Sequence, residues 1–352
     1  MCRLAPLTVL ASLLACGAPQ VLTHDVSFLV PLSQSQSFLS AATVLPRWQF
    51  DRLHPLTVVD EPDALYGALS VVSVRLDACF REGATPGPCR PQVRLVLQPV
   101  FDDGPGGLTT RDAAVHLFFS TTEGELETLV RGLAALRTER RVAAGDATAP
   151  HPGFSDAAFV KALRERLTPF LQPPALVRIT SMSVHASNLA WVFSGADVVN
   201  GVTTDLDIPT LGAEHHDHVT STGKDQAMEV TLDPGSRVEP ALTTLVAPGG
   251  LARATPEALS AAALAVQRLE DPATHNPGTV DCASCHVAAL AQRALVKAGQ
   301  AVEGSPGASG AYDDTRNLRA FGYFFATPAV SPRVQRETAL VRDDFARRLE
   351  TK

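Results

Sequence analysis

The segment at positions 282–286 combines two thiols and an imidazole within five residues. It reads Cys282-Ala283-Ser284-Cys285-His286, a CxxCH pattern. Two thiols three positions apart on one helical turn can form thioether bonds to the two vinyl edges of a porphyrin, and the adjacent histidine then supplies the proximal nitrogen to the iron. The pattern predicts one covalent haem c, attached through Cys282 and Cys285, with His286 as the proximal iron ligand.

Other uses of a CxxC pair require surroundings that this sequence does not provide. A thioredoxin-like redox pair requires a βαβ context, which positions 270–300 do not show. A zinc site requires a second pair of ligands, and the nearby sequence offers only His275. Covalent haem attachment is therefore the favoured interpretation.

The sixth position on the iron has no obvious ligand, because no methionine and no histidine follows His286. We expect His275 to fill it, since only a short stretch with Pro277 and Gly278 separates it from Cys282. An ordinary loop histidine at 275 is the alternative, and the sixth position would then be open or filled from elsewhere in the chain. The further candidates are His215, His216, His218, Met182 and Met228.

Two other groups of residues allow more than one interpretation. The sequence EHHDH at 214–218 could bind zinc or copper, or form a solvated turn. Four aromatic residues lie within 321–325 and could wall a porphyrin or belong to an ordinary core.

The N-terminus has the layout of an export signal. Arg3 is followed by an apolar run over residues 7–15, which is too short to span a bilayer. The sequence LLAC at 13–16 resembles the lipobox of bacterial lipoproteins. This resemblance implies a signal peptide over 1–15, a lipid on Cys16 and a cell-envelope location, where Gly17 in place of aspartate favours the outer over the inner membrane. An ordinary cleaved signal is the alternative.

Two other cysteines, Cys79 and Cys89, bracket a Gly/Pro-rich loop. Apolar and polar residues alternate before it, at 72–77, and after it, at 93–98, with the period of two that half-buried strands show. An oxidising compartment favours disulfides. We therefore expect a hairpin with a Cys79–Cys89 disulfide across its long turn; two free thiols are the alternative.

Local patterns predict the remaining elements. Thr122 with Glu125 fits a capping box, so a helix should begin there. Thr255-Pro256 and Ser331-Pro332 each combine an N-cap residue with a proline in the first turn, so we expect helices to begin there and to reach about Glu270 and Leu349. The other expected elements are strands at 114–120, 175–185, 189–199 and 226–232 and a helix through 159–167.

Composition changes near 246–255, beyond which the chain looks helical. Residues 251–352 resemble class I c-type cytochromes, with a helix, then CxxCH, then a terminal helix. The fold class expected is an α+β domain rich in antiparallel strands over 16–250, followed by a mostly α-helical cytochrome c-like haem domain. The sequence departs from that family because the downstream methionine ligand is missing.

Three functions remain open at this stage. The first is single-electron transfer by a membrane-tethered haem lipoprotein to a redox partner protein in the envelope. The second is an enzyme or a gas or peroxide sensor with an open sixth position. The third is a binding module whose haem is secondary. Net charge is −7 and the sequence has no basic stripe, so a nucleic-acid partner is not expected.

Overall fold

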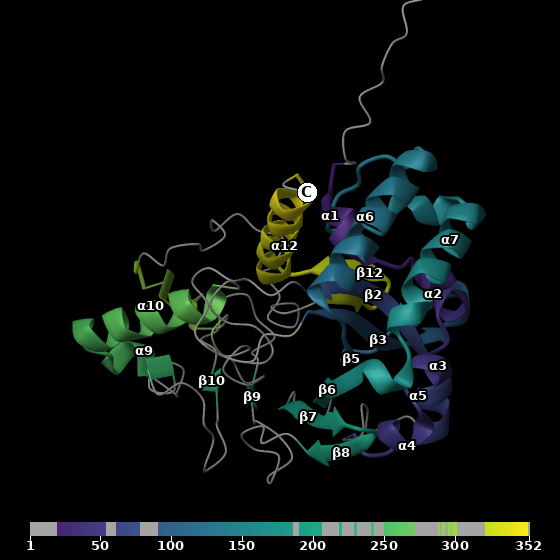
Figure 1. Ribbon diagram of the computed structural model, residues 1–352. Coiled ribbons are helices and arrows are strands. Elements are labelled where there is room, and N and C mark those ends of the chain that lie inside the picture. The colour runs from purple at the N-terminus through teal and green to yellow at the C-terminus, as the bar shows by residue number, and fades with distance from the viewer. Residues whose placement is uncertain are drawn as a thin grey trace, which may run out of the picture.

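The fold is organised around one large antiparallel sheet, which carries helices on one face and a C-terminal hairpin on the other (Figure 1). The computed structural model describes residues 20–53, 61–77, 91–185, 190–205, 218–219, 229–230, 241–242, 250–271, 288, 291–292, 295–296, 298–300 and 321–350.

The large sheet has eight strands in the order β1-β2-β3-β5-β6-β7-β8, with β4 paired to β3. Two small sheets pair β9 with β10 and β11 with β12. The strands are β1 (Ser27–Leu29), β2 (Leu69–Asp77), β3 (Gln92–Asp102), β4 (Leu108–Thr110), β5 (Ala113–Ser120), β6 (Leu176–His185), β7 (Ala190–Val199), β8 (Val202–Asp205), β9 (His218–Val219), β10 (Glu229–Val230), β11 (Phe321–Phe324) and β12 (Thr327–Val330).

Five short helices that the sequence patterns did not predict lie before β2. Longer helices, α6 and α7, follow β5; the short α9 and the longer α10 follow β10; and α12 follows β12. The helices are α1 (Thr23–Val26), α2 (Leu32–Phe38), α3 (Ala41–Val44), α4 (Arg47–Phe50), α5 (Pro62–Ala68), α6 (Glu123–Glu139), α7 (Ala157–Leu167), α9 (Gly250–Arg253), α10 (Pro256–Glu270) and α12 (Pro332–Glu350). None of the helices described has the length and apolar character needed to cross a bilayer.

Several local predictions are confirmed. The Thr122 hydroxyl accepts the Glu125 N–H while the Glu125 carboxylate accepts the Thr122 N–H, which is the predicted capping box at the start of α6. Thr255 caps α10, and α12 begins at Pro332. The predicted strands at 114–120, 175–185 and 189–199 correspond to β5, β6 and β7, and the helix through 159–167 to α7. Of the strand at 226–232, the structure describes β10.

The hairpin across the Cys79–Cys89 loop is also confirmed, because β2 and β3 pair antiparallel with Asp77 opposite Gln92. The simple alternation along β2 is wrong at one point. A bulge between Val71 and Ser73 inserts an extra residue, so Val72 joins the core cluster opposite to that of Val74.

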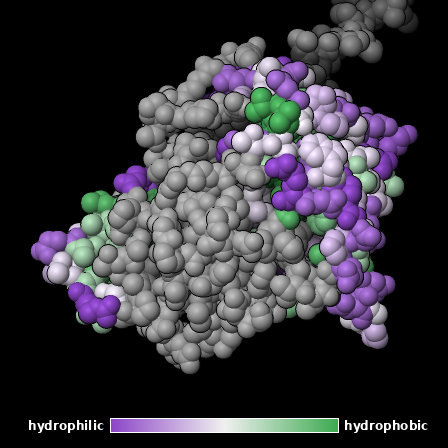
Figure 2. All heavy atoms as spheres, turned by 90° about the horizontal axis from the view of Figure 1, so that it is seen from below, coloured by the Kyte–Doolittle hydropathy of each residue, from purple (hydrophilic) through white to green (hydrophobic). Residues whose placement is uncertain are grey.

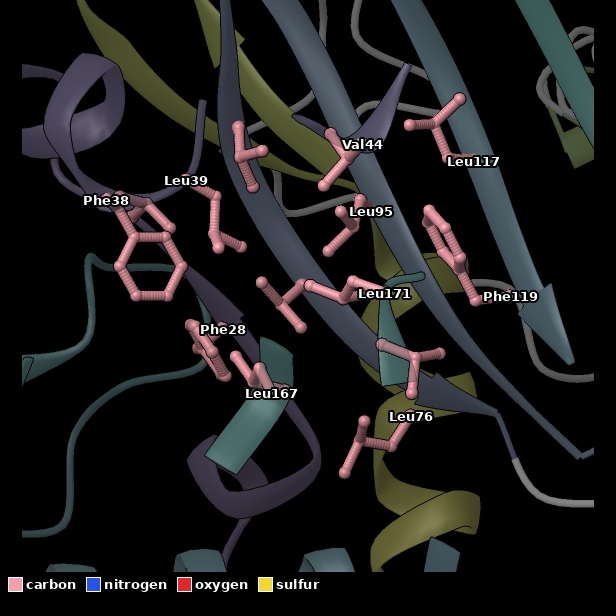
Figure 3. Packing of buried hydrophobic residues seen from close by; sticks show 14 of the residues in the cluster. Phe28, Phe38, Leu39, Val44, Leu76, Leu95, Leu117, Phe119, Leu167 and Leu171 are labelled. Carbon is pink, nitrogen blue, oxygen red and sulfur yellow. The ribbon is translucent and has the colours of Figure 1, made fainter. Parts of the chain in front are cut away.

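The helical face of the sheet carries the buried apolar side chains Val74, Leu76, Leu95, Leu117 and Phe119. Figure 3 shows Leu76, Leu95, Leu117 and Phe119 in the same cluster as Phe28, Phe38 and Leu167 from the surrounding elements. Leu126, Val130 and Leu133 line the α6 surface that faces this core, as the 3.6-residue period requires.

The opposite side of the sheet, the hairpin face, is covered by β11 and β12. The Gln98 side chain accepts the Tyr323 N–H at 2.7 Å and donates to the Tyr323 carbonyl at 3.0 Å, so one amide replaces a strand partner. The Tyr323 hydroxyl donates to the Val30 carbonyl at 2.8 Å. A Cβ on Gly322 would overlap the Gln98 amide, so only glycine allows this close approach.

The mostly α-helical, cytochrome c-like fold expected for residues 251–352 is wrong. Their described part includes a two-stranded sheet, and the hairpin and α12 belong to the same packing as the N-terminal sheet. Val334 near the start of α12 lies in the hairpin-face cluster, whereas Val341 and Phe345 lie in the helical-face core. The terminal helix therefore packs on the N-terminal sheet and its helices. Its apolar side chains complete the two clusters of apolar residues on the sheet.

Candidate functional site

The residues that the sequence singled out for chemistry lie outside the described part of the chain. These are Cys282, Cys285 and His286 of the CxxCH pattern, His275, Cys16, Cys79 and Cys89. Of the EHHDH sequence, only His218 is described, in β9, opposite Val230. The structure instead defines the two places where the chain enters and leaves the stretch that contains CxxCH.

One place is bonded to the start of α12, and the other to β2 and to β12, which directly precedes α12. On the entering side, the Arg333 guanidinium donates to the carbonyl of Leu269, in the last turn of α10. On the leaving side, the Ser73 hydroxyl donates to the Phe321 carbonyl at 2.8 Å, and Phe321 pairs with Val330, three positions before Arg333. The CxxCH-bearing stretch therefore starts and ends beside the hairpin face of the large sheet.

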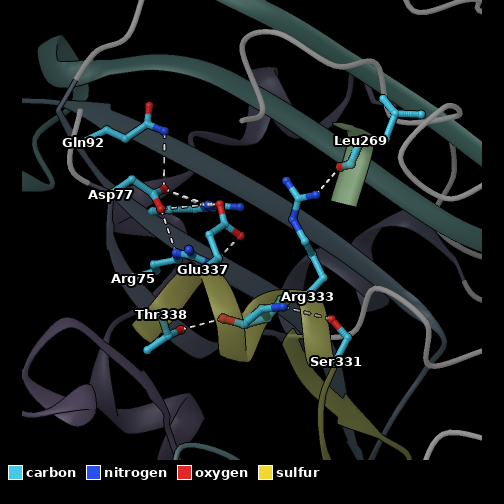
Figure 4. Close-up of polar contacts among 10 residues, drawn as sticks. Arg75, Asp77, Gln92, Leu269, Ser331, Arg333, Glu337 and Thr338 are labelled. Carbon is cyan, nitrogen blue, oxygen red and sulfur yellow. Dashed lines mark hydrogen bonds and ion pairs between the residues drawn. The ribbon is translucent and has the colours of Figure 1, made fainter. Parts of the chain in front are cut away.

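A buried network of charges lies at this point (Figure 4). Arg75 Nε lies 2.7 Å from Asp77 Oδ1, and Arg75 Nη1 lies 2.8 Å from Glu337 Oε2 on α12. The Arg75 side chain is 1% exposed, and these contacts are ion pairs whose angles fall outside hydrogen-bond geometry. On β3, Arg94 donates to both Asp77 oxygens at 2.9 Å, so this pair is bidentate.

Burial and charge act against each other in this network. Burial lowers the pKa of Arg75, and the Glu337 and Asp77 carboxylates oppose that effect. Burial would raise the pKa of Asp77, but Arg94 and Arg75 outweigh it and hold the pKa below its ordinary value. Asp77 is therefore a carboxylate at neutral pH, and the network keeps its ionic form.

A second buried polar cluster holds the first helix. The His24 and His151 rings lie 4.9 Å apart between their centroids, and both side chains are buried. His151 Nδ1 accepts the Gly153 N–H at 2.9 Å, and burial lowers the pKa of His151 to about 3. Burial also lowers the pKa of His24, although nearby groups of Asp146 and Ala149 oppose the shift. Both imidazoles are therefore neutral at physiological pH.

A third imidazole, His116, lies on β5 opposite Val96 and Thr180. Burial, and then the charge of Arg94, lower its pKa to about 3 against the opposing charge of Asp77. A neutral imidazole is the form that binds metals, but no three histidine, cysteine, aspartate or glutamate side chains gather into a metal-binding group within the described ranges.

The aromatic residues at 321–325 divide between two environments. Phe321 and Tyr323 are buried in the hairpin-face cluster, which confirms the core interpretation for these two. The Phe324 and Phe325 rings contact each other with their centroids 4.6 Å apart, and Phe325 is 52% exposed. Met182 is a half-buried residue of β6.

Comparison with known proteins adds no relative: no family model matches the chain, and neither a curated protein nor a solved structure matches it. The buried charges were missed at the sequence level because Arg75 and Asp77 occupy the polar positions of an alternating strand, where solvent is expected. Two signals could have indicated this buried network. Arg75, Asp77 and Arg94 lie on two strands that one hairpin joins, and Glu337 lies in a terminal helix that carries an apolar stripe.

Proposed function

We propose that this chain is a lipid-anchored, c-type haem protein of the bacterial cell envelope that transfers single electrons to a redox partner protein. The observation that carries the proposal is the CxxCH pattern at 282–286, together with an N-terminal sequence that has the layout of an export signal and the lipobox-like sequence ending at Cys16. The anchor would hold the protein at a membrane surface, with the outer membrane favoured.

The donor set suits haem c. The Cys282 and Cys285 thiols would form the thioethers, and the His286 imidazole would bind the iron from the proximal side. Bound haem would supply an iron centre that accepts and releases one electron. The His275 imidazole is our candidate for the opposite side of the iron, and ligation by two histidines would favour a low reduction potential because the potential-raising methionine is missing.

The supporting residues that the structure describes act at the base of the CxxCH-bearing stretch. Arg333 holds Leu269 before it, and Ser73 and Gln98 hold the hairpin after it. These contacts join the entering side of the stretch to α12 and the leaving side to the buried sheet.

A second function follows from one sequence observation. No methionine or histidine follows His286, so the iron could keep an open position and bind oxygen, nitric oxide or peroxide as an enzyme or sensor. Rapid CO binding by the reduced wild-type protein would favour this second function over electron transfer.

Covalent attachment is tested by haem staining of the denatured protein on a gel, after expression in a host that matures c-type cytochromes. The wild type should keep its stain, and the Cys282→Ala/Cys285→Ala variant should lose it. A Cys79→Ala/Cys89→Ala variant is the matched control and should stain like the wild type. Stain retained in the Cys282→Ala/Cys285→Ala variant would refute the proposal.

A further inference from the structure

We propose that the end of the molecule formed by α1 and the C-terminal end of α6 lies against the membrane, with lipid headgroups as its partner. This inference rests on the proposed lipidation of Cys16. It adds an orientation, which a lipid anchor alone does not set, because a long flexible tether would let the protein tumble.

The first described residues are fixed firmly to the fold. Arg137 at the end of α6 donates from Nη2 to the Gln20 carbonyl at 2.5 Å and from Nε to Asp25 Oδ1 at 3.0 Å. Asp25 in turn accepts the Leu22 N–H at 2.7 Å. Val21 is 4% exposed. The chain is therefore locked in place from Gln20 onward.

The tether between lipid and fold is short. Only Gly17, Ala18 and Pro19 separate Cys16 from Gln20. Four residue steps of fully extended chain reach about 14 Å, and a proline makes the segment stiffer. Gln20 must then stay within about 14 Å of the lipidated cysteine, so the surface around Gln20 has to face the headgroups.

Two exposed charges of opposite sign, Glu139 and Arg141, lie at the C-terminal end of α6. Arg140 is paired with Asp156 at 2.7 Å and Arg137 with Asp25, so these arginines are neutralised within the protein. Arg141, which follows α6, is exposed and makes no ion pair with the residues that the structure describes. Its guanidinium is free to meet a lipid phosphate.

The opposite end of the molecule carries three exposed apolar side chains, Trp48 on α4, Val199 on β7 and Val202 on β8, which could give contact area to a protein partner. In Figure 1, α1 and α6 lie at the top, whereas α4 and β8 lie at the bottom. Figure 2 views the protein from that lower end, where hydrophilic and apolar side chains are mixed among the coloured residues. A soluble redox partner would therefore meet the α4 end or the flanks of the protein.

The test compares two exposed alanines at opposite ends of the natively lipidated, full-length protein. Ala143→Cys lies just beyond α6, and Ala64→Cys lies on α5 toward the lower end. Each introduced thiol receives a nitroxide, and the protein is reconstituted in phosphatidylcholine vesicles that contain a lipid with a nickel-chelating headgroup. We expect paramagnetic relaxation at Ala143→Cys to exceed that at Ala64→Cys several-fold.

Two further variants separate the orientation from the anchor. An insertion of about 20 Gly/Ser residues after Gly17 extends the reach to about 25 Å and should make relaxation at the two sites similar. Equal relaxation in the protein of native tether length would overturn the orientation while leaving lipidation intact. Failure of the wild type to enter vesicles, or equal entry by Cys16→Ala, would overturn both proposals.

Discussion

Arg75 on β2 and Glu337 on α12 form an ion pair with 2.8 Å between Nη1 and Oε2, and both side chains are removed almost completely from solvent. Two residues far apart in the sequence thus join the central sheet to the terminal helix at the base of the CxxCH-bearing stretch. The physical consequences of this contact and of its surroundings can be measured.

Glu337→Ala should lower the free energy of unfolding by about 3 kcal/mol, because removing one partner leaves a buried charge poorly compensated. Denaturant titration followed by circular dichroism measures this loss. Asp343→Asn, on an exposed carboxylate of the same helix, should change stability by less than about 0.5 kcal/mol. A similar effect of both substitutions would show that burial of the pair does not matter.

Acid should destabilise the fold through His151 and His116, because the pKa of each is lowered in the folded protein. The pKa of His151 falls from an ordinary 6.5 to about 3, so its stabilising contribution is complete above pH 6.5 and is lost as pH falls toward 3. At pH 5 this single residue should cost about 2 kcal/mol relative to pH 7, and His116 should cost a similar amount.

His151→Asn is the matched variant for that prediction, since its amide oxygen can still accept the Gly153 N–H but does not titrate. The difference in unfolding free energy between pH 7 and pH 5 should shrink by about 2 kcal/mol in this variant. An unchanged pH dependence would mean that His151 does not titrate abnormally in the folded protein.

Gly322→Ala should destabilise the protein by about 1–3 kcal/mol, because the added methyl group displaces the Gln98 amide and also meets Val72 Cγ2 at 3.2 Å. Thermal unfolding measures the change. Gly124→Ala on α6 has open space around its Cβ position and should be neutral or stabilising by up to about 1 kcal/mol. The opposite order of the two effects would contradict the close packing of the hairpin.

The Cys79–Cys89 disulfide should stabilise the hairpin of β2 and β3 by up to about 3 kcal/mol, the scale expected for a loop of this length. Mass spectrometry of the exported protein under non-reducing conditions tests the bond directly. Two alkylatable thiols at these positions would exclude it, whereas loss of stability on reduction in the wild type but not in Cys79→Ala/Cys89→Ala would support it.

His275→Ala should convert a low-spin resting iron to high spin and allow CO to bind, if His275 is the sixth ligand. Absorption spectra of the reduced and oxidised proteins measure both effects. His218→Ala is the comparison variant and should leave the spectrum unchanged. A low-spin spectrum in His275→Ala would mean that another residue of the chain supplies the ligand.

Elements that depend on neighbouring residues could be predicted from the sequence. The capping box at Thr122, the start of α10 after Thr255 and the β2–β3 hairpin are fixed by short-range hydrogen bonding and by the alternation of apolar side chains. The CxxCH pattern likewise defines its chemistry through spacing along the chain, and it carries the whole proposal for haem.

Only the tertiary structure decided what each face of the sheet meets. The sequence cannot show that Arg75 and Asp77 are buried, because the groups that cover them, β11, β12 and α12, come from the far end of the chain. The bulge at Val72 exchanged the face of one apolar residue, and the terminal helix joined the N-terminal core instead of a cytochrome-like one. Contacts between distant segments depend on the shape and burial of the assembled fold, and local patterns do not contain that information.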